Sequence, residues 1–187
     1  MILYIMRHGE TASPHRFCGR TDVGLSNHGL KQTNDNIVKL SKEPIKTVYS
    51  TGLQRTDIAA KKFQEATAVS HIIDQRFIEL DFGDCECLTP EEINRKFPEV
   101  VSHYMETGIL QYPNGETIAA LVQRVSQGLK DIINTGQNSL IITHNGVIRA
   151  IHMYLKGGSF DQYDAKTGEI FQFKLDSTTN GAITKEH

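Results

Sequence analysis

Short apolar runs alternate along this chain with longer stretches in which apolar residues recur at helical spacing. The runs at residues 2–6 and 139–143 predict buried strands, because parallel strands covered on both faces carry continuous apolar sequence. Residues 47–50 and 69–73 predict two more strands. Residues 170–175 alternate apolar and polar side chains, a pattern typical of an edge strand.

Helices are predicted between these strands, over residues 26–40, 54–65, 89–107, 117–134 and 147–155. Ser26 is a good N-cap for the first, and Thr89-Pro90-Glu91-Glu92 forms a capping box with proline at the first helical position. Pro98 interrupts the third helical stretch. The alternation of strands and helices predicts an α/β fold, a three-layer α/β/α sandwich with a mostly parallel central sheet. Residues 80–116 break the alternation and predict a small helical lid within one domain, 1–187.

Composition removes several classes of function. The chain has 187 residues, a net charge of -2 and no basic run, so neither nucleic acid nor an anionic membrane is an expected partner. It contains no targeting segment and no apolar run of membrane-spanning length, which predicts a cytoplasmic protein. Cys18, Cys85 and Cys87 make a poor disulfide framework and no zinc site, which predicts reduced thiols. The oligomeric state, a homodimer included, stays open.

Residues that could take part in catalysis lie directly after two of the predicted strands. His8 follows the first strand beside Arg7, and His144 follows the strand at 139–143. The carboxyl ends of parallel strands share one edge of a sheet, where ligands bind in open α/β folds. Arg55 lies in the first turn of the helix after the second strand and faces the same edge. Cationic groups brought together in this way need an anion between them, and a phosphoryl group fits.

Six stretches carry a family resemblance. Arg7-His8-Gly9-Glu10-Thr11 after an N-terminal strand resembles the signature of the histidine phosphatase superfamily, also called phosphoglycerate mutase-like. Its other motifs are matched by Gly19 to Gly29, by Ser50 to Arg55 with Gly52 in place of a proline, by the acid-bearing segment 77–84, by Gly115-Glu116-Thr117 and by residues 142–147. The acid-bearing segment looks most like that of α-ribazole phosphatases and broad-specificity small-molecule phosphatases. Two departures are Pro14, where the family often has asparagine, and Cys87, where glycine is usual.

The resemblance implies a role for each matched residue. His8 is the implied nucleophile and Glu79 the implied general acid–base, while Arg7, Arg55 and His144 are the implied phosphate ligands. His144, in its protonated form, also counts among the catalytic groups because it would stabilise the transferring phosphoryl. Neither a metal nor a cofactor is expected. Glu10 is interpreted as ordering its loop, and six further histidines as structural or exposed: His15, His28, His71, His103, His152 and His187.

The implied function is an enzyme, a metal-independent phosphomonoesterase acting through a phosphohistidine on a small phosphorylated metabolite. α-Ribazole 5'-phosphate is one candidate substrate. Two alternatives compete with this interpretation. One is a cofactor-dependent phosphoglycerate mutase, although dedicated mutases of this kind carry longer insertions than residues 80–116. The other is a non-catalytic phosphate-binding regulatory module, which would need neither His8 nor Glu79.

Overall fold

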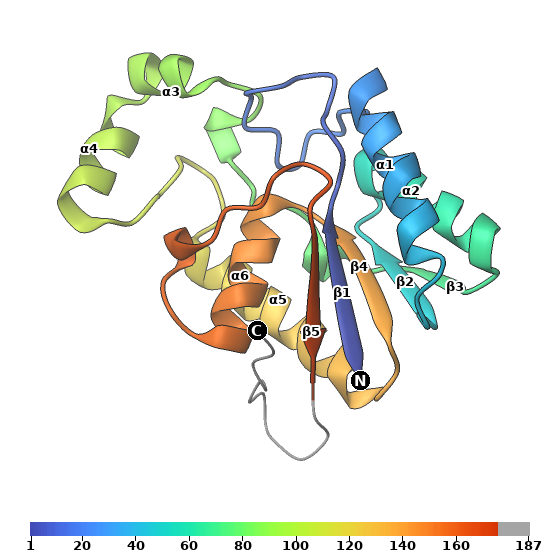
Figure 1. Cartoon of the computed structure of the whole chain (residues 1–187). Helices are drawn as coiled ribbons and strands as arrows, with labels where there is room; N and C mark the ends of the chain where they lie inside the picture. Colours follow the sequence, from blue (N-terminus) through green and yellow to red (C-terminus); the bar gives the residue numbers. More distant parts are fainter. Residues whose placement is uncertain (176–187) are drawn as a thin grey trace.

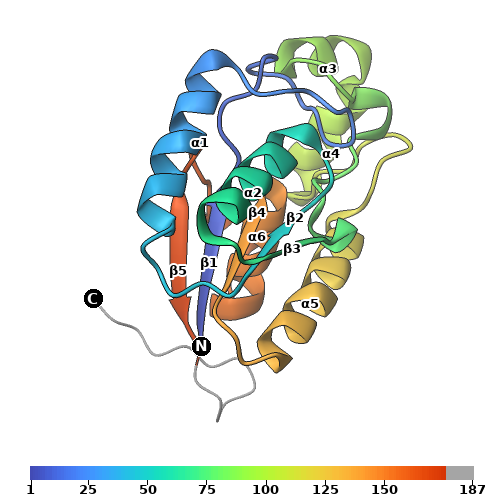
Figure 2. The same cartoon turned by 90° about the vertical axis from the view of Figure 1, so that its right-hand side faces the viewer.

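A five-stranded sheet forms the centre of the computed structural model, which describes residues 1–175 (Figures 1 and 2). The strands lie in the order β3-β2-β4-β1-β5, and only β5 runs antiparallel to its neighbour. The strands are β1 (Ile2–Arg7), β2 (Thr47–Ser50), β3 (Ser70–Ile73), β4 (Ser139–Thr143) and β5 (Ile170–Lys174). The predicted mostly parallel sheet is thus confirmed, with residues 170–174 as its edge strand.

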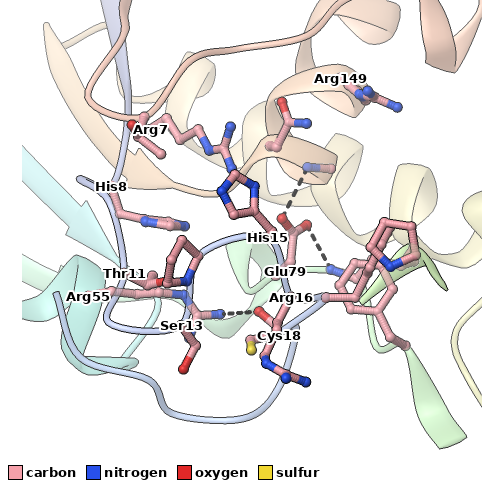
Figure 3. Close-up of a pocket in the computed structure, with 18 of the residues that line it drawn as sticks. Arg7, His8, Thr11, Ser13, His15, Arg16, Cys18, Arg55, Glu79 and Arg149 are labelled. Carbon is pink, nitrogen blue, oxygen red and sulfur yellow. Dashed lines mark hydrogen bonds between the residues drawn. The ribbon is translucent and has the colours of Figure 1, made fainter. Parts of the chain in front are cut away.

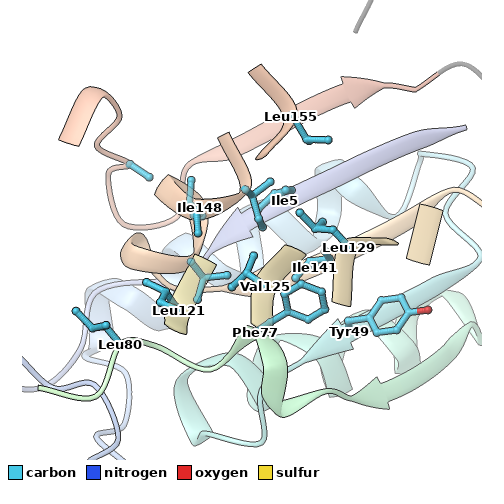
Figure 4. Packing of buried hydrophobic residues seen from close by; sticks show 14 of the residues in the cluster. Ile5, Tyr49, Phe77, Leu80, Leu121, Val125, Leu129, Ile141, Ile148 and Leu155 are labelled. Atoms are coloured by element: carbon cyan, nitrogen blue, oxygen red, sulfur yellow. The ribbon is translucent and has the colours of Figure 1, made fainter. Parts of the chain in front are cut away.

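Helices cover both faces of this sheet, as the three-layer prediction requires. On one face lie α1 (Asn27–Leu40) and α2 (Gln54–Thr67), and on the other α5 (Ile118–Asn134) and α6 (Asn145–Lys156). Successive side chains of a strand point to opposite faces. Tyr4 and Met6 of β1 accordingly pack with α1 and α2, whereas Leu3 and Ile5 join the core beneath α5 and α6 (Figure 4).

The helices begin where the sequence places their caps. Ser26 accepts a hydrogen bond from the backbone N–H of Gly29, and Thr89 forms the full capping box with Glu92 at the start of α3 (Pro90–Lys96). Pro98 ends this helical stretch and starts the next helix, α4 (Pro98–Thr107). Three short 3-10 helices complete the description: η1 (Gln75–Phe77), η2 (Gly83–Cys85) and η3 (Phe160–Gln162).

The two helices of the predicted lid, α3 and α4, lie beyond the carboxyl ends of β1 and β4 (Figure 1). Ile93 of α3 and Val100 of α4 are buried and join the core beneath α5 and α6. This contact fixes the lid helices above the sheet edge that carries His8 and His144. The assignment of residues 1–187 to one domain stays a prediction.

The structure shows the contacts of two of the six histidines that were interpreted as structural or exposed. His71 shares a hydrogen bond of 2.8 Å between its Nε2 and the hydroxyl of Ser50. His152 is buried, neither of its ring nitrogens has a hydrogen-bond partner among the described residues, and it stacks on Tyr163. Both therefore have structural roles, as predicted, and His187 lies outside the described residues. Within residues 1–175, no helix is both long and apolar enough to cross a membrane.

Candidate active site

The parallel pairing of β1 with β4 creates the site. In this register Arg7 lies opposite Thr143, so the next residue of each strand, His8 and His144, enters the same space. The backbone N–H of His8 donates to the carbonyl of Thr143 at 2.9 Å, which extends the ladder to the histidine itself. The two imidazole rings meet edge to face with centroids 5.1 Å apart.

His8 is held as a neutral ring with a defined tautomer. Its Nδ1 lies 2.7 Å from the carbonyl oxygen of Gly9, and because a carbonyl only accepts, Nδ1 must carry the proton. Burial lowers the pKa of His8 to about 3, with Arg55 and Arg7 contributing and the bond to Gly9 opposing the shift. The Nε2 lone pair is therefore available at neutral pH on a ring that lines the cavity (Figure 3).

Two arginines supply the positive charge of the site. Arg55 is almost fully buried, and its guanidinium donates to the carbonyls of Thr21 (2.8 Å), Cys18 (3.0 Å) and Gly19 (2.7 Å). Arg7 donates to the carbonyl of Ala165, while its Nε is buried and has no partner among the residues that the structure describes. Burial lowers the pKa of both groups, and neither forms a salt bridge within residues 1–175. Their charge is held in place by neutral carbonyls and remains available to an anion.

His144 lies behind the cavity. It is completely buried, its Nδ1 accepts from Nε of Arg55 at 3.3 Å, and its Nε2 lies 3.1 Å from the Thr51 hydroxyl. Burial, reinforced by Arg55, lowers its pKa well below the usual value. This ring is therefore neutral here, with its proton on Nε2. A protonated His144 beside a transferring phosphoryl group stays a prediction.

Glu79 projects into the cavity beside the start of α6 (Figure 3). One carboxylate oxygen accepts from the backbone N–H of Leu80 at 2.9 Å and the other from that of Gly146 at 3.2 Å. The first turn of a helix favours an anion at this point. A pairing of Glu79 with Arg76 is excluded, because Arg76 binds Asp74 and Asp131.

Sequence reasoning missed the residues that position Glu79. Arg124 of α5 donates to the backbone carbonyls of Arg76, Ile78 and Glu79, and a salt bridge of 2.7 Å to Glu116 orients its guanidinium. The segment before Glu79 is thereby tied to α5. The motif that contains Glu116 was visible in the sequence, but nothing indicated that its partner would be Arg124.

Backbone geometry bears on Gly9 and on two of the positions that differ from the family pattern, Gly52 and Cys87, whereas nothing in the structure explains Pro14. A Cβ on Gly9 would lie 2.3 Å from the carbonyl oxygen of Gly29, so the loop can pack on α1 only without a side chain there. Gly52 has a φ of 86°, which proline cannot adopt. Cys87 has a φ of 58°, the left-handed region that glycine adopts most easily. Glu10 accepts from the Ser26 hydroxyl at 2.7 Å and so orders its loop, as predicted.

A cavity of about 610 Å³ opens in front of His8. Arg7, His8, Arg55 and Glu79 all line it, which brings four of the five predicted site residues to one space. The lining also contains an aromatic cluster, in which Phe82 meets both Phe17 and Tyr112 edge to face at 5.1 Å. The lining also includes residues to which the sequence assigned no role in the site: Pro14, His15, Arg16, Asn145 and Arg149.

Comparison with known proteins gives a family match over nearly the whole chain. The model of the histidine phosphatase superfamily (branch 1) matches residues 3–177. Phosphoserine phosphatase 1 of Hydrogenobacter thermophilus is 29% identical over 166 residues, which are 86% of this chain and 79% of that protein. A bifunctional protein of Mycobacterium tuberculosis is 29% identical over 179 residues, and the chain spans 47% of its length.

Among solved structures, the α-ribazole phosphatase from Shigella flexneri superimposes with a TM-score of 0.86. The alignment covers 100% of both chains at 22% sequence identity. This likeness shows that the two proteins share a fold.

The site predicts opposite tautomers for its two imidazoles. Nitrogen-15 NMR of the histidine rings at pH 5 should show His8 neutral with the proton on Nδ1, because its pKa is about 3. His144 should be neutral with the proton on Nε2, because Nδ1 accepts from Arg55. A charged imidazolium at either position, or His8 protonated on Nε2 alone, contradicts this description of the site.

Proposed function

The chain belongs to the histidine phosphatase superfamily (branch 1), and we propose that this phosphatase hydrolyses a small phosphate monoester through a phosphohistidine at His8, without a metal ion. One observation carries the proposal. The Nδ1–H of His8 is bound to a backbone carbonyl, which leaves a neutral Nε2 at the cavity with the unpaired charges of Arg7 and Arg55. A nucleophile needs that protonation state, and the incoming phosphoryl oxygens need those charges.

In the first step Nε2 of His8 attacks phosphorus and the ester P–O bond breaks. Arg7 and Arg55 stabilise the charge spread over the three equatorial oxygens. His144 holds its proton on Nε2, hydrogen-bonded to the Thr51 hydroxyl, and its ring lies edge to face with that of His8. In the proposed mechanism this N–H donates instead to a phosphoryl oxygen once substrate is bound. The bond that His144 accepts from Arg55 also orients that guanidinium. Water then attacks the phosphohistidine and regenerates His8.

Glu79 manages the proton in both steps. In its acid form it gives a proton to the leaving alkoxide, and as the carboxylate it then takes one from the attacking water. Within residues 1–175 each of its oxygens accepts one backbone hydrogen bond, which leaves lone pairs to accept a proton from the cavity. A binding module would need no such group, which argues against the non-catalytic alternative.

The cavity also supports a substrate class. Outside the phosphate end its arginines are already neutralised, since Arg16 pairs with Glu92 at 2.9 Å and Arg149 pairs with Asp161 and Asp164. No arginine is left there for a substrate carboxylate, which argues against phosphoglycerate and so against the mutase alternative. The wall of Phe17, Phe82 and Tyr112 suits an uncharged leaving group that contains a ring. α-Ribazole 5'-phosphate meets both conditions.

The covalent step predicts a trapped intermediate. Incubation with ³²P-labelled substrate in EDTA, followed by an alkaline quench, should leave acid-labile label on His8. The variant His8→Ala should carry no label and lose turnover. Undiminished activity in His8→Ala, or turnover abolished by EDTA, contradicts the mechanism.

The proton-transfer role of Glu79 predicts a dependence on the leaving group. An alkoxide needs the proton in the transition state, whereas nitrophenolate is already a stable anion. Glu79→Gln should therefore slow single-turnover cleavage of an alkyl phosphate by about 10²–10⁴-fold and that of p-nitrophenyl phosphate far less.

The matched control for this comparison is Glu10→Gln, which changes another cavity-lining carboxylate. It should leave the ratio of the two rates unchanged. Equal losses for both substrates in Glu79→Gln would assign Glu79 to pocket geometry alone and remove it from catalysis.

The neutral outer cavity predicts a substrate preference. The kcat/KM for α-ribazole 5'-phosphate should exceed that for 3-phosphoglycerate or phosphoserine by on the order of 10². Glu92→Gln keeps the capping box but frees Arg16 from its ion pair, so it should improve only the two acidic substrates. A wild-type preference for an acidic substrate would overturn the class proposed here and leave the phosphohistidine mechanism standing.

A further inference from the structure

Two cysteines from distant segments meet in the wall of the cavity. Cys18 belongs to the loop after β1, and Cys87 lies 69 positions later, between η2 and α3. Their sulfur atoms are 3.0 Å apart and share an S–H···S hydrogen bond. Both residues are partly exposed, and Cys18 lines the cavity itself (Figure 3). An oxidant can therefore reach a pair of thiols that already face each other.

The backbone holds this pair together. The N–H of Cys87 donates to the carbonyl of Phe17 at 2.8 Å, and the N–H of Phe17 donates to the carbonyl of Leu88 at 2.9 Å. Arg16 adds a bond of 2.7 Å to the carbonyl of Cys87. The two segments thus run side by side through reciprocal hydrogen bonds. Backbone hydrogen bonds therefore keep the two cysteines next to each other.

The position of Cys87 is itself unusual. Its φ of 58° lies in the left-handed region, where a residue with a Cβ is strained and glycine is not. The side chain that strains the backbone at this position is the one that contacts Cys18. The third cysteine, Cys85, is fully buried in the core and contacts neither sulfur through a hydrogen bond in the part of the chain described.

We propose that Cys18 and Cys87 form a reversible disulfide that ties the loop after β1 to the lid segment. A bond length of about 2.05 Å requires the sulfurs to approach by roughly 1 Å, which the side chains can supply. Regulatory disulfides of this kind occur in compartments whose structural thiols stay reduced.

The reaction balances with a low-molecular-weight disulfide as the oxidant. One of the two thiols attacks first as its thiolate, breaks the S–S bond of the oxidant and releases one thiol. The other thiol loses its proton as it attacks the mixed disulfide and releases the second thiol. One protein S–S bond forms, two S–H bonds are lost, and the oxidant is reduced to two thiols.

The disulfide would join two segments, the loop after β1 and the segment before α3, that hydrogen bonds already hold together. The Glu86 carboxylate accepts from the backbone N–H groups of Gly19, Arg20 and Thr21, across the same two segments. Cys18 also offers its carbonyl to Arg55. A disulfide at this point would add a covalent link to a junction that otherwise depends on hydrogen bonds. It would also close a long loop of the unfolded chain, so oxidation should stabilise the protein.

The test uses the full chain, reduced and then incubated with oxidised glutathione. After acid quenching and alkylation, peptide mapping without reduction should find Cys18 joined to Cys87 and only Cys85 alkylated. Dithiothreitol should reverse the change. Oxidation should raise the Tm by about 5 °C or more. The variant Cys85→Ala should form the same link.

The matched variants Cys18→Ser and Cys87→Ser should show no internal link and no rise in Tm on oxidation, although their reduced forms keep the circular dichroism of the wild type. Glutathione attached to both cysteines without an internal link would overturn the proposal. So would a link through Cys85, or an equal rise in Tm in Cys18→Ser. None of these measurements depends on which phosphate ester the enzyme cleaves.

Discussion

The parallel ladder between β1 and β4 is the constraint on which the site depends. Its register sets Arg7 opposite Thr143 and so delivers two imidazoles to one point, 5.1 Å apart. A slip of one residue would turn Leu3 and Ile5 to the face of Tyr4 and Met6 and exchange the two cores. The site geometry is therefore enforced by the burial of apolar side chains on both faces of the sheet, at some distance from the chemistry.

Burial also determines the charge state of the site. The two histidines are neutral because burial disfavours the charged imidazolium, whereas the two arginines keep their charge because a guanidinium loses its proton only far above neutral pH. Arg55 gives its hydrogen bonds to backbone carbonyls, which orient the guanidinium without cancelling its charge. The site thus holds positive charge beside a neutral nucleophile, and a phosphate dianion satisfies both.

Most of the fold could be predicted from the sequence because its determinants are local. The strands were visible as apolar runs, Ser26 and Thr89 as caps, and Pro98 as the break between α3 and α4. The edge position of residues 170–174 followed from their alternating pattern. Arg7, His8, Arg55 and Glu79 could be placed together because they belong to motifs at the ends of these elements.

What could not be predicted depends on contacts between distant segments. Arg124 binds the backbone carbonyl of Glu79, which lies 45 positions earlier in the sequence. Cys18 and Cys87, whose sulfurs are in contact, are 69 positions apart. The charge state of His144 likewise follows from complete burial against Arg55, which no local pattern encodes.

The close approach of Gly9 to Gly29 limits how this protein can be altered. A methyl group on Gly9 would meet the Gly29 carbonyl at 2.3 Å, and one on Gly29 would meet the Glu10 carbonyl at 2.0 Å. Both obstacles are main-chain atoms, so trimming a neighbouring side chain cannot relieve them. An engineered loop that reshapes the cavity wall at Pro14 and His15 must therefore keep both glycines, because their contact sets how closely the loop packs on α1.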